Sequence, residues 1–258
     1  MKVIDLNCDL GESFGDYKMG LDEQVIPLIS SANVACGFHA GDPNVMNDTV
    51  QTAKQHHVAV GAHIGYPDLV GFGRRNLDIT NEQLRNDIIY QIGALRQFVE
   101  LHGLTLQHVK PHGAMGNMAF VDERIARVIV ETMLEVTPEL YLYVLPGTAA
   151  HRIAEQSGLP FILEVFADRA YNDDLTLVSR KEEGAVIHEP ERAAEHVLRM
   201  IQDGVVKTRT GAYVPIQAES ICVHGDTAGA IHIVKSIRTL LQQEGIAIQS
   251  FQQREAVE

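Results

Sequence analysis

Residues 3–10 read Val-Ile-Asp-Leu-Asn-Cys-Asp-Leu, and apolar and polar side chains alternate along the whole stretch. This period of two predicts a β-strand that places Asp5, Asn7 and Asp9 on one face and the apolar side chains on the other. The same design, an apolar run that ends in polar residues, recurs at 33–39, 59–63, 108–112, 162–168 and 220–226. Polar side chains collected where strands stop are typical of a barrel with its active site at the carboxyl ends of its strands. An enzyme is therefore the leading hypothesis.

Strand-like runs and amphipathic helical segments alternate along the chain. We expect strands at about 2–9, 32–38, 58–64, 106–112, 140–145, 160–166 and 219–224. We expect helices at about 42–56, 80–102, 122–135, 148–157, 190–203 and 227–244. This alternation predicts βαβ units and a mainly parallel sheet, closed into a TIM-like α/β barrel that is distorted and seven-stranded, (βα)7. The stretch 246–251 is a candidate eighth strand, and Asp226 or Thr227 is a candidate cap for the last helix.

A doubly wound open sheet is the alternative fold. The polar strand ends are spread over most of the chain, and only closure of the sheet brings all of them together. The sequence therefore favours the barrel.

The composition describes an acidic chain with enough apolar residues for a large core. It has 258 residues, of which 45% are hydrophobic, and a formal net charge of −13. No linker-like or low-complexity tract divides it, so we expect one domain over residues 1–258. The charge disfavours nucleic acid and anionic membranes as partners. Because there is no signal-like or membrane-spanning apolar stretch, we expect a cytoplasmic protein.

The first three polar strand ends supply candidates for the site. Asp9 can act as a general base or bind a cation, and Asn7 projects beside it. Asn33 and His39 share one face with small residues between them, which leaves room for a ligand. His63 ends the next run in the same way. We expect Asp9, His39 and His63 to be catalytic, and the two asparagines to bind substrate.

The later runs contribute cations, a further histidine and carboxylates. A lysine at the inner end of a strand is costly to bury, so we expect Lys110 to be catalytic, either stabilising an oxyanion or acting as a base. Arg74 or Arg169 suits a substrate carboxylate. The remaining expected substrate-binding residues lie on the polar faces of these runs: His112, Glu164, Asp168 and His224.

Asp9, His39 and His63 also form a candidate carboxylate–imidazole set for Zn²⁺ or Mn²⁺. They come from three separate runs rather than from a local metal-binding motif. The sequence contains no phosphate-binding loop, dinucleotide-binding motif or nucleophile elbow. The chain by itself therefore predicts no ATP site, no dinucleotide site and no serine hydrolase.

Cysteines and helical histidines are expected to have other roles. Three cysteines are too few for a disulfide framework. Cys8 and Cys222 are expected to be small buried side chains, whereas Cys36 lies closer to the candidate site. Histidines in helical segments, such as His56 and His196, are expected to be solvated.

The motifs themselves resemble the LamB/YcsF family, in order and over nearly the whole chain. The segments that carry the resemblance are NCDLGESFG (7–15), ANVACGFHAGDP (32–43), GAHIGYPD (61–68), VKPHGA (109–114), EVFADR (164–169) and CVHGD (222–226). The resemblance implies a barrel similar to those of glycoside hydrolases and polysaccharide deacetylases. It also implies an ATP-dependent 5-oxoprolinase activity that opens 5-oxo-L-proline to L-glutamate, with this chain as the A component working beside separate subunits B and C.

This resemblance suggests a mechanism that starts from a lactam. A lactam is a poor electrophile, and phosphorylation of its amide oxygen would create a good leaving group. We expect ATP to be handled with, or by, the partner subunits. Asp9 or His63 would act as base or ligand, while Lys110 and His39 would stabilise negative charge.

Two further hypotheses stay open. One is a stand-alone metal-dependent amidohydrolase or carbohydrate deacetylase, which the Asp/His/His set supports. The other is a non-catalytic scaffold for subunits B and C, which is less favoured because a scaffold has no need for a polar barrel mouth.

Overall fold

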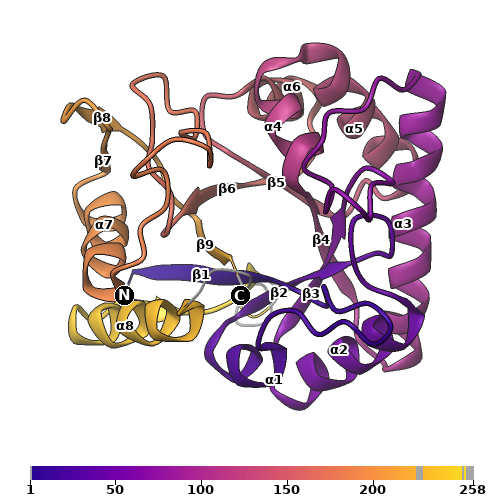
Figure 1. The fold of residues 1–258 in the computed structure, drawn as a ribbon, viewed down its shortest axis with the longest axis horizontal. Helices are drawn as coiled ribbons and strands as arrows, with labels where there is room; N and C mark the ends of the chain where they lie inside the picture. The colour runs from indigo at the N-terminus through magenta and orange to yellow at the C-terminus, as the bar shows by residue number, and fades with distance from the viewer. Residues whose placement is uncertain (1, 225–228, 252, 254–258) are drawn as a thin grey trace.

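Seven parallel strands close into a barrel in the computed structural model, which describes residues 2–224, 229–251 and 253. The strands are β1 (Val3–Leu10), β2 (Ser31–Ala35), β3 (Ala59–Ile64), β4 (Leu106–Pro111), β5 (Tyr141–Val144), β6 (Phe161–Phe166) and β9 (Ser220–His224). Each pairs with the next in this order, and β9 also pairs with β1. That last pairing closes the sheet (Figure 1). The TIM-like α/β barrel is confirmed, and the doubly wound open sheet is wrong.

Helices form a layer outside the barrel (Figure 1). They are α1 (Asp22–Val25), the 3-10 helix η1 (Ile26–Leu28), α2 (Pro43–Gln55), α3 (Asn81–Leu101), α4 (Gly113–Val121), α5 (Glu123–Val136), α6 (Ala149–Ser157), α7 (Pro190–Gln202) and α8 (Ala230–Gln243). Local side chains fix where two of them begin. Asp42 accepts hydrogen bonds from the first-turn amides of α2, and Thr80 forms a capping box with Gln83 at the start of α3.

The structure contains elements that the sequence pattern did not predict. An antiparallel hairpin of β7 (Val205–Lys207) and β8 (Tyr213–Pro215) lies in the chain between α7 and β9. The short helix α4 follows β4 directly. Within the described residues, no helix combines the length and the apolar character needed to cross a membrane.

The candidate eighth strand forms only in part. β10 (Ala247–Ile248) pairs with Val3 and Ile4, ahead of the stretch of β1 that pairs with β9. It therefore extends the sheet beside the start of β1 and does not form an eighth strand of the closed barrel. The expected helix cap at Asp226 or Thr227 lies outside the described residues.

The alternation in β1 separates an apolar layer from a polar barrel interior. Ile4, Leu6, Cys8 and Leu10 of β1 belong to the hydrophobic core, and Asp5 is buried on the other face. Its carboxylate accepts hydrogen bonds from the hydroxyls of Ser30 and Ser31 at 2.7 Å, of Tyr143 at 2.8 Å, and of Ser220. Four hydroxyl donors satisfy this buried charge, which allows a polar floor in the barrel.

His196 differs from the expectation for a helical histidine. It is buried on the inner face of α7, and its Nε2 has no hydrogen-bond partner among the described residues. Burial, followed by the nearby Arg199 and Arg192, lowers the pKa of His196 to about 4. The prediction of a solvated side chain was wrong here because His196 shares a helix face with the apolar side chains that pack inward, whereas His56 is exposed as expected.

Candidate active site

Two asparagines connect the strands beneath the barrel mouth. Asn33 donates from Nδ2 to Asn7 Oδ1 at 2.7 Å and to Asp9 Oδ1 at 2.8 Å. Its own Oδ1 accepts from His108 Nε2 at 2.6 Å, and Asn7 Nδ2 donates to Glu164 Oε1 at 2.9 Å. These bonds hold side chains of β1, β2, β4 and β6 in one layer. The two asparagines therefore position the carboxylates above them.

Lys110 lies at the centre of this layer, buried between two carboxylates. Its Nζ is 2.8 Å from Asp9 Oδ1 and 2.9 Å from Glu164 Oε1, and it also donates to Cys222 Sγ at 2.9 Å. Burial alone lowers the pKa of Lys110, but the neighbouring carboxylates, Asp9 first, more than offset it and raise the pKa well above its usual value. The neighbouring carboxylates therefore favour the charged ammonium, which suits charge stabilisation better than the role of a general base.

The two carboxylates differ in their electrostatics. Burial raises the pKa of Asp9, but His63 and Lys110 outweigh this and hold the pKa well below its usual range. Burial dominates at Glu164 and raises its pKa. Asp9 is thus the carboxylate of the pair whose charged form its neighbours favour, and it is the one that lines the cavity.

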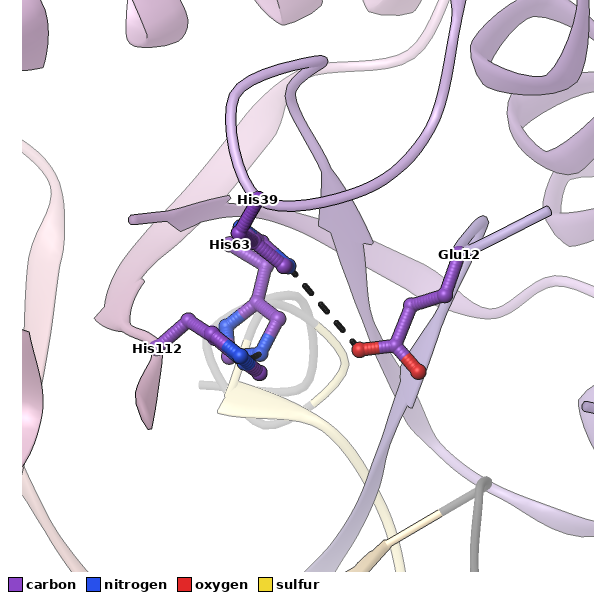
Figure 2. Close-up of side chains that lie close together, drawn as sticks. All are labelled: Glu12, His39, His63 and His112. Atoms are coloured by element: carbon purple, nitrogen blue, oxygen red, sulfur yellow. Dashed lines mark hydrogen bonds and ion pairs between the residues drawn. The ribbon is translucent and has the colours of Figure 1, made fainter. Parts of the chain in front are cut away.

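Three histidines gather beside Asp9. His63 Nε2 is 3.3 Å from Asp9 Oδ2 and 2.9 Å from His112 Nδ1. The ring of His39 stacks on that of His112 with centroids 3.8 Å apart, and His39 Nε2 is 3.9 Å from Glu12 Oε1 (Figure 2). Burial, followed by the neighbouring histidines, lowers the pKa of both His39 and His112 well below the usual value.

A cavity of about 440 Å³ opens above this group. The sequence-predicted residues that line it are Asp9, His63, Arg74, Lys110, His112, Arg169 and His224. The remaining predicted residues lie behind or beside its wall: Asn7, Asn33, His39, Glu164 and Asp168. Asp168 accepts a hydrogen bond from His224 Nδ1 at 2.8 Å, and so orients a residue that does face the cavity.

The cavity wall is rich in cations, some of which the sequence did not indicate. Arg180 and Lys181, on the loop between β6 and α7, line it together with Arg74 and Arg169. Arg169 is buried, donates to the Val178 carbonyl at 2.6 Å, and has its pKa lowered to about 10 by burial and by Arg180. Several guanidinium groups on one wall favour an anion between or beside them.

Comparison with known proteins decides the family. The sequence profile of the LamB/YcsF family matches residues 4–256. The chain belongs to the LamB/YcsF family. A relative from Natranaerobius thermophilus, named as the A component of 5-oxoprolinase, is 52% identical over 250 residues, which is 97% of this chain and 97% of the relative.

Solved structures agree with this membership. The "Lactam Utilization Protein" of Thermus thermophilus superposes with a TM-score of 0.92 at 44% identity, covering 97% of this chain and all of the other. A polysaccharide deacetylase from Bacillus cereus gives a TM-score of 0.50 at 13% identity, covering 97% and 92% of the two chains. The second likeness concerns the fold alone, and it is the barrel type that the resemblance implied.

Within the part of the chain that the structure describes, residues from the LamB/YcsF motifs line the cavity, and the three cysteines differ in their surroundings. Cys8 packs into the core and Cys222 is buried against Lys110. Cys36 is also buried, does not line the cavity, and has its pKa raised to about 12 by burial. Arg180 and Lys181 lie beyond the 164–169 motif in a segment without periodicity, so only the path of the loop reveals them.

Proposed function

We propose that this LamB/YcsF chain is the A component of an ATP-dependent 5-oxoprolinase, which opens the lactam 5-oxo-L-proline to L-glutamate. The observation that carries the proposal is the buried Lys110 ammonium, held at 2.8 Å and 2.9 Å by Asp9 and Glu164 on the floor of a cation-lined cavity. The names of the relatives from Natranaerobius thermophilus and Thermus thermophilus support the same substrate class.

When a lactam opens, water adds to the carbonyl carbon and negative charge develops on the oxygen of that carbon; the C–N bond then breaks, and the ring nitrogen takes a proton and becomes the amine of glutamate. A fixed ammonium in a site with little water stabilises that charge strongly, because no solvent has to reorganise when the charge develops. Lys110 supplies this ammonium. Asp9 and His63 face the same cavity and are the groups available to take a proton from the attacking water.

The carboxylate of 5-oxoproline needs a cationic partner away from the reacting carbonyl. Arg74 and Arg169 line the wall, and a guanidinium binds a carboxylate through two parallel hydrogen bonds. Arg180 and Lys181 extend the positive wall, so an intermediate that also carries a phosphoryl group finds cations on the same side.

ATP is the co-substrate in this proposal, and separate subunits B and C handle it with or for this chain. The sequence has no phosphate-binding loop, which is why we assign nucleotide chemistry mainly to the partners. The Natranaerobius relative is named as one component of its enzyme, which implies further subunits in that protein.

The test is an assay of glutamate formation from 5-oxo-L-proline and ATP with each of the three subunits omitted in turn. Glutamate should form only when this chain, B, C and ATP are all present. Asp9→Asn should lower kcat at least about 100-fold, since the proton acceptor and the charge beside Lys110 are lost together. Asp78→Asn is the matched control, because it makes the same substitution at an exposed side chain that lies outside the cavity. Full activity of folded, partner-bound Asp9→Asn, or undiminished turnover without this chain, would refute the proposal.

A second candidate function is a stand-alone metal-dependent amidohydrolase or deacetylase. The buried cluster of Glu12, His39, His63 and His112 favours it, because these side chains offer one carboxylate and three imidazoles within 4.8 Å. This candidate requires hydrolysis of an amide by the isolated chain without ATP. The scaffold hypothesis instead requires Asp9→Asn to leave the activity of the assembled subunits unchanged.

A further inference from the structure

Four strand ends each bring one buried side chain to a common point beside the cavity. Glu12 follows β1, His39 follows β2, His63 lies in β3 and His112 follows β4. One potential ligand atom from each lies within 4.8 Å of all the others. Figure 2 shows the three imidazole rings gathered beside the Glu12 carboxylate.

The hydrogen bonds of two rings fix where their lone pairs point. His63 Nδ1 is 3.0 Å from the Lys110 carbonyl, and His112 Nε2 is 2.8 Å from the Phe72 carbonyl. A carbonyl only accepts, so both of these nitrogens carry hydrogen. In the neutral rings the opposite nitrogens, His63 Nε2 and His112 Nδ1, then present lone pairs to each other at 2.9 Å. A positive particle, either a proton or a metal ion, has to lie between them.

His39 decides between the two. A proton shared by His63 and His112 leaves His39 unsatisfied, since neither of its ring nitrogens has a hydrogen-bond partner among the described residues. The ring is fully buried, and an unpaired polar group in such a place is costly. A metal ion gives a nitrogen of His39 a partner and adds the nearby Glu12 carboxylate as a charged ligand.

We propose that Glu12, His39, His63 and His112 bind one divalent transition-metal ion, with Zn²⁺ as the best match to a set of three imidazoles and one carboxylate. Neighbouring ligand atoms of a tetrahedral zinc site lie about 3.4 Å apart, given bonds of about 2.0–2.1 Å. The distance between His63 Nε2 and His112 Nδ1 is 2.9 Å, and that between His39 Nε2 and Glu12 Oε1 is 3.9 Å, so the two lie on either side of that value. The carbonyls of Lys110 and Phe72 are the outer partners that such histidines need.

This ligand set differs from the one that the sequence suggested. Asp9 gives way to Glu12 and His112, because these two complete with His39 and His63 a set of ligand atoms that all lie within 4.8 Å of one another. Asp9 Oδ1 accepts hydrogen bonds from Lys110 and Asn33 at 2.8 Å each, and Asp9 Oδ2 lies 3.3 Å from His63 Nε2 as a charged neighbour of the site. The His39 ring lies nearly parallel to that of His112, with an interplanar angle of 6°, so it has to turn for its nitrogen to coordinate. The ion would join the ends of the first four barrel strands. The inference does not depend on the proposed lactam chemistry, but with the ion bound both nitrogens of His63 are engaged, so Asp9 is then the group that takes a proton from water.

The test is metal binding by the full chain, with no substrate and no partner subunits. Protein stripped with a chelator is titrated calorimetrically with Zn²⁺, and its melting temperature is followed. We expect one ion per chain, a higher melting temperature on binding, and X-ray absorption that shows imidazole ligands. His39→Ala and Glu12→Gln should each weaken binding at least about 10-fold to 100-fold. His196→Ala is the matched control, because it removes another buried imidazole away from the cluster.

Three results would overturn the proposal. One is the absence of stoichiometric binding to folded, stripped protein at micromolar Zn²⁺. Another is wild-type affinity in both folded His39→Ala and folded Glu12→Gln. The third is loss of binding in Asp9→Asn while Glu12→Gln keeps it, which would assign the ion to the Asp9 set instead. Circular dichroism of each stripped variant shows that it is folded, so a failure to bind is not a failure to fold.

Discussion

The Lys110 side chain couples the stability of the barrel to the chemistry of its mouth. Lys110→Met removes the ammonium that joins Asp9 and Glu164, and leaves two buried carboxylates without their common cation. Removing one charged partner of a buried ion pair lowers the free energy of unfolding by about 3–5 kcal/mol. We expect a loss of that size in the free energy of unfolding, measured by urea denaturation.

A double-mutant cycle separates this coupling from a simple packing defect. Adding Glu164→Gln to Lys110→Met removes one of the two uncompensated charges. The double variant should therefore lose less free energy of unfolding than the sum of the losses in the two single variants. Strict additivity of the two substitutions would contradict the electrostatic explanation.

His196, which does not line the cavity of the candidate site, gives the stability of the protein a pH-dependent contribution. Its folded-state pKa is about 4, below the value of about 6.5 in an unfolded chain. The unfolded chain therefore binds the proton first, and stability falls as the pH falls from about 6.5 towards 4. Between pH 6.5 and pH 5.5 the wild type should lose about 1 kcal/mol more than His196→Gln. Urea denaturation at the two pH values measures this, and an unchanged difference between the two proteins would contradict it.

At the scale of the elements, the close packing of β3 on β4 depends on a glycine. Gly61 stands opposite His108 in the strand pairing, and a Cβ at Gly61 would lie 2.0 Å from His108 Nε2. Gly61→Ala should therefore displace a buried ring that also stacks on Tyr143, and destabilise the protein by about 3 kcal/mol. Denaturation with urea provides the measurement.

Gly93 on α3 is the matched control for that substitution. It is exposed, and a Cβ there meets no atom within 4 Å. Gly93→Ala should stabilise the helix by about 0.5–1 kcal/mol, because alanine loses less backbone entropy than glycine. Similar effects of the two substitutions would show that packing against His108 is not the cause.

At the scale of the whole molecule, the first strand joins both ends of the chain. β1 pairs with β2, β9 and β10, so the barrel closes only when segments more than 200 residues apart meet. We therefore predict that residues 1–258 unfold as one domain. Scanning calorimetry should show a single heat-absorption peak, and two resolved peaks would contradict the prediction.

The sequence by itself determined the strand faces, the barrel and the group of polar side chains at its mouth. Hydrophobic periodicity is local, so Asp9 and Lys110 were recognised as inward-facing without any knowledge of their partners. Closure of the barrel could also be predicted from the sequence, because closure is what brings together polar strand ends that are spread over the whole chain.

Only the tertiary structure decided which of these side chains touch. The 2.8 Å contact of Lys110 with Asp9 and the convergence of Glu12 with three histidines depend on how the strands and their loops are placed around the barrel. Arg180 reaches the cavity through a loop that has no periodic pattern. Distances between residues far apart in sequence are set by the closure of the barrel and by the paths of its loops. The local alternation of side chains predicts neither of these.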